Sequence, residues 1–175
     1  MGVMRSKFKT LFFLLLLLFI LMAIFSSFFP DEVMTSKWVM IAGQKETVQK
    51  KLEDINTWES WNLLLKSASP VTTSKLKDTL TPGDKISWIA NNGAQNEIQI
   101  TEKTIDGIAM DIKLVGEKPI HSGFSIAQRK DSVQVVWFIV EKLAWYPWEK
   151  IYGMMASDIK GPALQQSLDN LKKEF

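Results

Sequence analysis

The feature that most constrains the fold of this chain is a stripe of apolar residues near its C-terminal end. Apolar side chains recur there mostly every three or four residues, the spacing of one helix face. The stripe consists of Trp148, Ile151, Tyr152, Met155, Ile159, Leu164, Leu168, Leu171 and Phe175. Gly161-Pro162 interrupts it, and because proline lacks the backbone N–H that continues a helix, we expect one long helix in two segments with a kink there. Such a helix needs an apolar partner of similar length.

A series of strand-like segments supplies the only candidate for that partner. Apolar and polar residues alternate in them, which predicts strands half-buried on an antiparallel sheet. Asp106-Gly107 is a strong hairpin signal, and Lys130-Asp131 marks another turn. The predicted strands are residues 85–90, 97–101, 108–114, 120–128 and 132–142.

In the residues that precede these strands, the spacing of the apolar side chains changes twice. Residues 36–41 form an apolar strand-like run, 45–56 have the spacing of a short surface helix, and 57–64 continue as a second short helix or turn. A polar loop is expected over 67–74. Because strands run consecutively and a helix ends the chain, the order indicates an α+β fold rather than βαβ units.

An uncharged segment lies near the N-terminus. Residues 10–29 carry no charge, and 11–25 contain only Leu, Phe, Ile, Met and Ala. Twenty helical residues span about 30 Å, the thickness of the bilayer hydrocarbon. The alternative is a cleaved signal peptide, whose apolar core is usually about 7 to 15 residues. Because this run is longer and cleavage after Ser26 would be poorly specified, we expect an uncleaved transmembrane signal anchor over residues 10–29.

The charges that flank this segment predict its orientation. Arg5, Lys7 and Lys9 precede it, whereas Asp31 and Glu32 follow it. Because basic residues tend to stay on the cytoplasmic side, residues 1–9 are expected to form a basic cytoplasmic tail. The domain of residues 36–175 is then expected on the outer side of the membrane, periplasmic or extracellular.

Charge and cysteine content exclude several classes of function. Three of the 21 basic residues precede the apolar segment and no acidic residue does, so the rest carries 18 basic against 19 acidic residues, a formal charge of −1. This near-neutral portion gives no electrostatic basis for binding nucleic acid. The absence of cysteine removes disulfides, thiol catalysis and cysteine-ligated metal sites.

Residues that could carry catalysis are few. His121 is the single histidine, so no multi-histidine metal site can form, and no phosphate-binding loop or nucleophile elbow is present. No metal or other cofactor is therefore expected. His121 is out of phase with Phe124 and Ile126, which places it on the outer face of the sheet.

Glu141 is the more interesting acidic residue. It continues the face of Val135, Trp137 and Ile139, so alternation would aim it inward, where burial could suit it to proton transfer. We favour the alternative, in which the strand has already ended and Glu141 pairs with Lys142 or solvent. Both Glu141 and His121 are thus only weak catalytic candidates.

Four stretches together resemble the helix-grip fold of the SRPBCC superfamily. They are residues 55–62, 83–88, 132–137 and Gly161-Pro162 with 168–172. The superfamily includes START-like lipid-binding domains, the birch pollen allergen family and the polyketide cyclase/dehydrase family. The resemblance implies a curved antiparallel sheet around a long C-terminal helix, with an apolar cavity between them and no shared catalytic residue.

That cavity would be lined by residues on the inward faces of the strands and on the helix. Trp88 and Trp137 would form flat aromatic walls, and Trp148, Tyr152 and Met155 would open the helix beside them. An equally weighted alternative is that these residues fill the core. The candidate ligand-binding residues are Trp88, Ile98, Ile100, Met110, Ile112, Phe124, Val135, Trp137, Trp148, Tyr152 and Met155.

Aromatic residues also cluster at 144–148, whose sequence is Ala-Trp-Tyr-Pro-Trp. Tryptophan and tyrosine prefer a boundary between apolar and polar surroundings, such as a pocket mouth or a membrane surface. Burial at the edge of the core is an equally good interpretation.

These features predict a membrane-tethered domain that binds a hydrophobic small molecule or lipid without turnover. Its partners would be that ligand and the membrane. A polyketide cyclase or dehydratase-like enzyme is the first alternative, and a protein-interaction module is the second.

Overall fold

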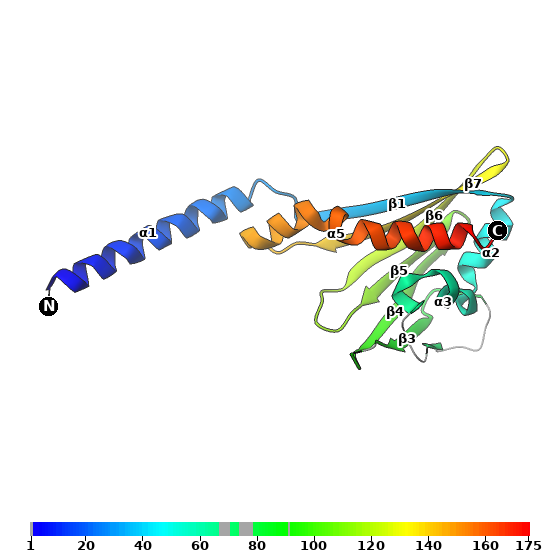
Figure 1. The fold of residues 1–175 in the computed structure, drawn as a ribbon, viewed down its shortest axis with the longest axis horizontal. Coiled ribbons are helices and arrows are strands. Elements are labelled where there is room, and N and C mark those ends of the chain that lie inside the picture. Colours follow the sequence, from blue (N-terminus) through cyan, green and yellow to red (C-terminus); the bar gives the residue numbers. More distant parts are fainter. Residues whose placement is uncertain (1, 67–70, 74–78, 91) are drawn as a thin grey trace. The chain divides into compact units, whose positions relative to one another are not determined.

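The computed structural model describes residues 2–66, 71–73, 79–90 and 92–175 (Figure 1). The chain divides into two compact units. The smaller comprises Met1–Val33 and Lys142–Met155, and the larger comprises Met34–Glu141 and Ala156–Phe175.

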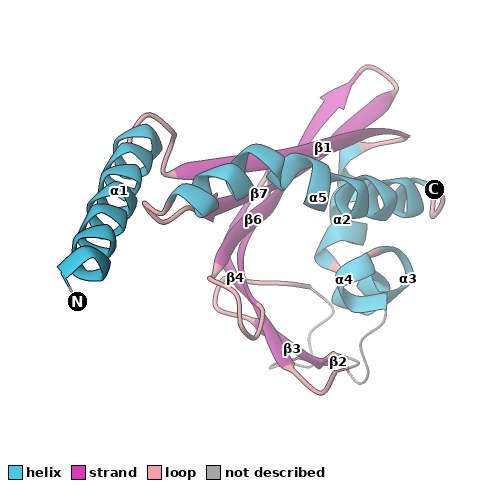
Figure 2. Ribbon diagram, turned by 60° about the vertical axis from the view of Figure 1, so that its left-hand side comes forward, coloured by secondary structure: helices cyan, strands magenta, loops and turns pink. Residues whose placement is uncertain are grey.

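A seven-stranded sheet forms the frame of the larger unit (Figure 2). Its order is β1-β7-β6-β5-β4-β3-β2, and consecutive strands from β2 to β7 pair antiparallel. The sheet is curved and unclosed, and a long C-terminal helix completes the α+β helix-grip architecture predicted from the sequence. The strands are β1 (Glu32–Ala42), β2 (Val71–Thr73), β3 (Lys85–Ile89), β4 (Gln95–Thr104), β5 (Gly107–Lys113), β6 (Ile120–Arg129) and β7 (Ser132–Lys142).

Tight turns connect the central strands where the sequence indicates them. Thr104 pairs with Gly107 at the end of the β4–β5 hairpin, so Asp106-Gly107 lies at its turn. Lys130 has a φ of 53°, the left-handed conformation that closes the β6–β7 turn next to the Arg129–Ser132 pair. Both turn predictions are confirmed.

Short helices connect β1 to the rest of the sheet. They are α2 (Lys45–Glu53), the 3-10 helix η1 (Ile55–Thr57), α3 (Trp58–Trp61) and α4 (Leu63–Lys66). The predicted helix over 45–56 ends earlier because Asp54 accepts a hydrogen bond from the Asn56 backbone N–H at 3.0 Å and starts η1. The predicted polar loop over 67–74 lies outside the described residues except for 71–73, which form β2.

Helix α5 (Pro147–Lys172) is one continuous element with Pro162 inside it. It starts at a proline, whose missing N–H costs nothing in a first turn. The expected single long helix is confirmed, with Pro162 within it, and its end at Lys172 falls before Phe175. Gly161 has a packing role as well, because a Cβ there would lie 2.7 Å from Lys37 Cε on β1.

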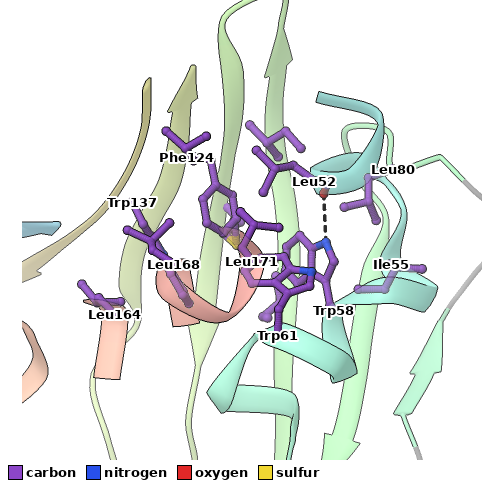
Figure 3. Close-up of a cluster of buried hydrophobic side chains, with 14 of the residues drawn as sticks. Leu52, Ile55, Trp58, Trp61, Leu80, Phe124, Trp137, Leu164, Leu168 and Leu171 are labelled. Carbon is purple, nitrogen blue, oxygen red and sulfur yellow. Dashed lines mark hydrogen bonds between the residues drawn. The ribbon is translucent and has the colours of Figure 1, made fainter. Parts of the chain in front are cut away.

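The core of the larger unit is built on the second half of the α5 stripe (Figure 3). Leu168 and Leu171 are fully buried, and Leu164 is nearly so. Aromatic rings from α3 and the sheet pack in this core, with ring centroids 5.8 Å apart for Trp58–Phe124 and 5.0 Å apart for Phe124–Trp137. The Trp58 indole N–H donates to the Leu52 carbonyl at 2.9 Å.

The first half of the stripe behaves differently. Trp148, Ile151, Met155 and Ile159 are each more than half exposed. The expectation of an apolar stripe covered along its whole length is therefore wrong for these exposed positions. Helical periodicity reports an apolar face, but it does not report what covers that face.

The smaller unit contains α1 (Gly2–Ser26) and the chain from Lys142 to Met155. Residues Lys7–Ser26 have a mean hydropathy of 2.7, and by length and composition this helix could cross a membrane or act as a signal sequence. The Leu143 backbone N–H donates to the Asp31 carbonyl at 2.8 Å, and the Ser26 hydroxyl donates to the Trp145 carbonyl.

Candidate ligand-binding cavity

The larger unit contains an apolar cavity of about 260 Å³. Its walls come from α4, from strands β5, β6 and β7, and from the second half of α5. The lining residues are Leu63, Leu64, Ile112, Leu114, Glu117, Ile120, Trp137, Ile139, Ile159, Lys160, Ala163, Leu164 and Ser167. Sheet and C-terminal helix thus both contribute to it.

Trp137 is the aromatic wall of this cavity, and hydrogen bonds fix its orientation. Its indole N–H donates to Ser122 Oγ at 3.0 Å, and the Ser122 hydroxyl donates to the Phe138 carbonyl at 2.8 Å. The ring of Phe124 packs against the Trp137 indole, with the two ring centroids 5.0 Å apart. A buried indole held in this way presents a rigid, flat apolar surface.

Lys160 is the basic residue of the cavity wall. Its Nζ lies 2.7 Å from Glu141 Oε1 and 3.6 Å from Glu117 Oε2. The side chains of Lys160 and Glu141 are only 23% and 13% exposed, so solvent screens this pair less than it screens a surface ion pair. One ammonium group therefore lies between two carboxylates at the edge of an apolar space.

Glu141 differs from the interpretation that the sequence favoured. Strand β7 continues to Lys142, so Glu141 is still within the sheet, and its carboxylate pairs with the Lys160 ammonium group on α5. The sequence could not show this, because the partner is brought close only by packing of α5 against the sheet. The geometry gives Glu141 the role of an ion-pair partner beside the cavity.

His121 lies on the outer face of the sheet, as predicted. Its side chain is half exposed, and Nδ1 lies 3.0 Å from Asp111 Oδ1 on the neighbouring strand. His121 does not line the cavity. Within the described residues, moreover, no group of three or more His, Cys, Asp or Glu side chains could hold a metal ion.

The candidate ligand-binding residues divide into three sets. Ile112 and Trp137 line the cavity. Trp148, Tyr152 and Met155 belong to the smaller unit, and Trp148 and Met155 are exposed there. The remaining six are buried in the core cluster and do not line the cavity: Trp88, Ile98, Ile100, Met110, Phe124 and Val135. For these six the core interpretation describes the packing, because helices α2 and α3 cover that part of the sheet face.

The sequence missed most of the lining. Ile139 shares the inward face of Trp137, and Leu164 belongs to the apolar stripe, so both could have been predicted as lining residues from the sequence pattern. Lys160 carried none, because a lysine on an amphipathic helix normally marks the solvated face. The sequence predicts a helix or turn at Leu63 and Leu64, but it does not indicate what these side chains face.

Comparisons with known proteins show the fold. No protein-family model and no curated protein sequence matches the chain. A START superfamily protein from Mycobacterium smegmatis aligns with a TM-score of 0.59 at 17% identity, over 81% of this chain and 95% of that protein. A Staphylococcus aureus protein of unknown function aligns with a TM-score of 0.65 at 12% identity, over 82% and 93% of the two chains.

A third similar structure is DynU16, a protein of the dynemicin biosynthetic locus. It aligns with a TM-score of 0.57 at 13% identity over 82% of this chain. The chain spans only 46% of the length of DynU16. At these identities the likeness concerns the fold alone, and the fold is the START-like helix grip expected from the sequence.

Proposed function

We propose that this protein is a membrane-tethered binding protein that holds a small hydrophobic molecule, or the acyl part of a lipid, without chemical turnover. The observation that carries the proposal is the apolar cavity bounded by Trp137 of the sheet and Leu164 of α5. Cavities lined by apolar side chains with few polar groups are typical of small-molecule sites.

The size of the cavity limits the ligand. Ligand pockets commonly measure about 300–1,000 Å³, so 260 Å³ lies just below that range. A single medium-length acyl chain or a small ring system fits such a volume better than a whole phospholipid. Ile159 lines the cavity and is half exposed, so the polar end of a ligand can reach solvent beside it.

The charges at the cavity favour binding over catalysis. Among the described residues that line it, Glu117 and Lys160 are the ionisable ones, and they lie 3.6 Å apart. Lys160 also bonds to Glu141. Groups engaged with one another in this way stabilise the structure of the cavity edge, and His121, the single histidine, does not line it.

The proposed tether is the apolar helix α1. If α1 spans the membrane, Arg5, Lys7 and Lys9 favour a cytoplasmic N-terminus and a domain on the outer side. A hydrophobic ligand is concentrated in the bilayer, so a tether that holds the cavity nearby raises its effective concentration.

A cavity-filling substitution tests the proposal. Ala163 lines the cavity from an exposed position on α5, so Ala163→Phe should fill part of the space without disturbing the core. Gln166→Phe places the same side chain on an exposed position of the same helix that does not line the cavity.

The full chain and both variants would be purified from membranes, and their bound small molecules would be extracted and quantified by mass spectrometry. We expect a discrete species in the unchanged chain and in Gln166→Phe, and its loss in Ala163→Phe. Equal amounts in all three proteins would show that the molecule binds elsewhere and would refute the proposal.

A further inference from the structure

A second apolar surface lies in the smaller unit, and none of its residues lines the cavity. Six side chains of this surface are between 37% and 66% exposed although all are aromatic or aliphatic. They are Trp145, Tyr146, Trp148, Ile151, Met154 and Met155, and together we name them the aromatic-methionine patch. Clusters of exposed apolar residues on this scale mark interaction surfaces.

Four of the six patch residues form one face of the first turns of α5, and Trp145 and Tyr146 directly precede the helix. Trp148, Ile151, Met154 and Met155 fall within an arc of about 120° at 3.6 residues per turn. Lys150 and Gly153 lie on the opposite side and are buried. The start of α5 is therefore the opposite of an ordinary surface helix, because its buried side carries the Lys150 charge and its exposed side is apolar.

Contacts within the smaller unit fix that orientation. The Lys150 ammonium is 3% exposed and donates to Asp31 Oδ1 at 2.7 Å and to the Pro30 carbonyl at 2.9 Å. Gly153 is packed so closely that a Cβ there would lie 2.3 Å from Leu143 Cδ1. Rotation of the helix would break these contacts, so the apolar side stays outward.

The patch is continuous with the apolar surface of α1. The rings of Trp145 and Phe19 meet edge to face, with centroids 6.1 Å apart. Tyr146 and Trp148 stack with centroids 5.0 Å apart and planes 5° apart. Tryptophan and tyrosine are enriched where a membrane protein meets the interface, because their rings are apolar and their N–H and O–H groups seek water.

From these observations we propose that the aromatic-methionine patch is a membrane-contact surface that inserts into the interfacial region of the bilayer crossed by α1. The inference rests on the membrane tether in the proposed function, and it adds a second, non-spanning contact. Interfacial helices of this kind bury their apolar face about 5–10 Å into the boundary of headgroups and acyl chains. The surface would hold the start of α5 at a fixed depth.

Single-cysteine labelling tests this directly, because the chain has no cysteine of its own. Met154→Cys and, separately, Ile151→Cys would carry an environment-sensitive fluorophore on the patch. Ile105→Cys is a matched control, since Ile105 is an exposed aliphatic residue at the β4–β5 turn of the larger unit. Leu16→Cys in α1 reports on the tether itself.

The labelled full-length proteins would be measured in phosphatidylcholine nanodiscs with doxyl quenchers placed shallow or deep in the acyl chain. We expect blue-shifted emission and shallow quenching at Met154 and Ile151, deep quenching at Leu16, and no quenching at Ile105. Quenching at Leu16 without quenching at either patch position would overturn the inference and leave the tether intact. Absence of quenching at all positions would overturn both.

A second copy of the chain is the competing occupant of the patch. It would shift the emission of Met154 and Ile151 to the blue, but doxyl lipids would not quench it. That result would also overturn the inference.

Discussion

Lys160 of α5 and Glu141 of β7 form an ion pair, with Nζ 2.7 Å from Oε1, next to the apolar cavity. Glu117 lies on the other side of the same ammonium group at 3.6 Å. Two carboxylates face one cation, so Glu117, Glu141 and Lys160 together carry a formal charge of −1. An anionic ligand head would meet repulsion there, whereas a neutral head would not.

Ligand charge preference should therefore depend on Glu141. We expect Glu141→Gln to increase the affinity for decanoate relative to decanol, because the variant removes one negative charge beside Lys160. The measurement is competition by each compound against a photoreactive decanol bound to the full-length protein. Glu102→Gln, which removes an exposed acidic residue on β4, serves as the control. An unchanged preference in Glu141→Gln would show that the ligand head does not approach Lys160.

The orientation of Trp137 should depend on Ser122. In Ser122→Ala the buried indole N–H loses its acceptor, and an unsatisfied buried donor costs about 1–3 kcal/mol. We expect the free energy of unfolding by urea to fall by that amount. Ser125→Ala changes an exposed serine of the same strand and should have little effect. Equal losses in the two variants would contradict the role of this hydrogen bond.

Leu168 should be among the most sensitive positions of α5. It is fully buried in the core of Figure 3, so Leu168→Ala removes apolar contacts and leaves a cavity, at a cost of about 2–5 kcal/mol. Gln166→Ala, at an exposed position of the same helix, should change the free energy of unfolding by less than about 0.5 kcal/mol. Chemical denaturation followed by circular dichroism measures both. A tolerant Leu168 would mean that α5 does not pack on the sheet as described.

Stability should also respond to acid through Glu97. Burial raises the pKa of this carboxyl, but hydrogen bonds and charge interactions from Lys85 and Lys113 outweigh it, so the net pKa is lowered from 4.5. A carboxyl with a lower pKa in the folded state stabilises the fold above its unfolded pKa, and this contribution is lost as the pH falls through the folded pKa.

Glu97→Gln should therefore flatten the loss of stability below about pH 4.5. The free energy of unfolding, measured by urea from pH 6 to pH 3, gives the comparison. A variant with the same acid dependence as the unchanged chain would show that the lysine pair does not favour the charged carboxylate in solution.

The local sequence pattern was enough to predict the fold, but it predicted only part of the cavity lining. Alternation and turn residues such as Asp106-Gly107 predicted the strands, because both are read within a few residues of the chain. The α5 stripe predicted the helix but not its environment. Leu168 and Ile159 follow the same periodicity, yet one is fully buried and the other is half exposed.

Tertiary packing decides the rest. Trp137 and Val135 share one strand face, but only Trp137 lines the cavity, because what covers each depends on helices distant in sequence. The pairing of Lys160 with Glu141 joins residues 19 positions apart on two different elements. No spacing rule within either element predicts such a contact.

The central claim is that a hydrophobic ligand occupies the cavity between sheet and α5. The most direct test is photolabelling of the full-length protein in nanodiscs with a diazirine-bearing decanol, followed by peptide mass spectrometry. Our account predicts adducts on the peptides that contain Leu63, Leu64 and residues 159–167, and their suppression in Ala163→Phe but not in Gln166→Phe. Adducts confined to α1, or adducts at the cavity peptides that persist unchanged in Ala163→Phe, would contradict it.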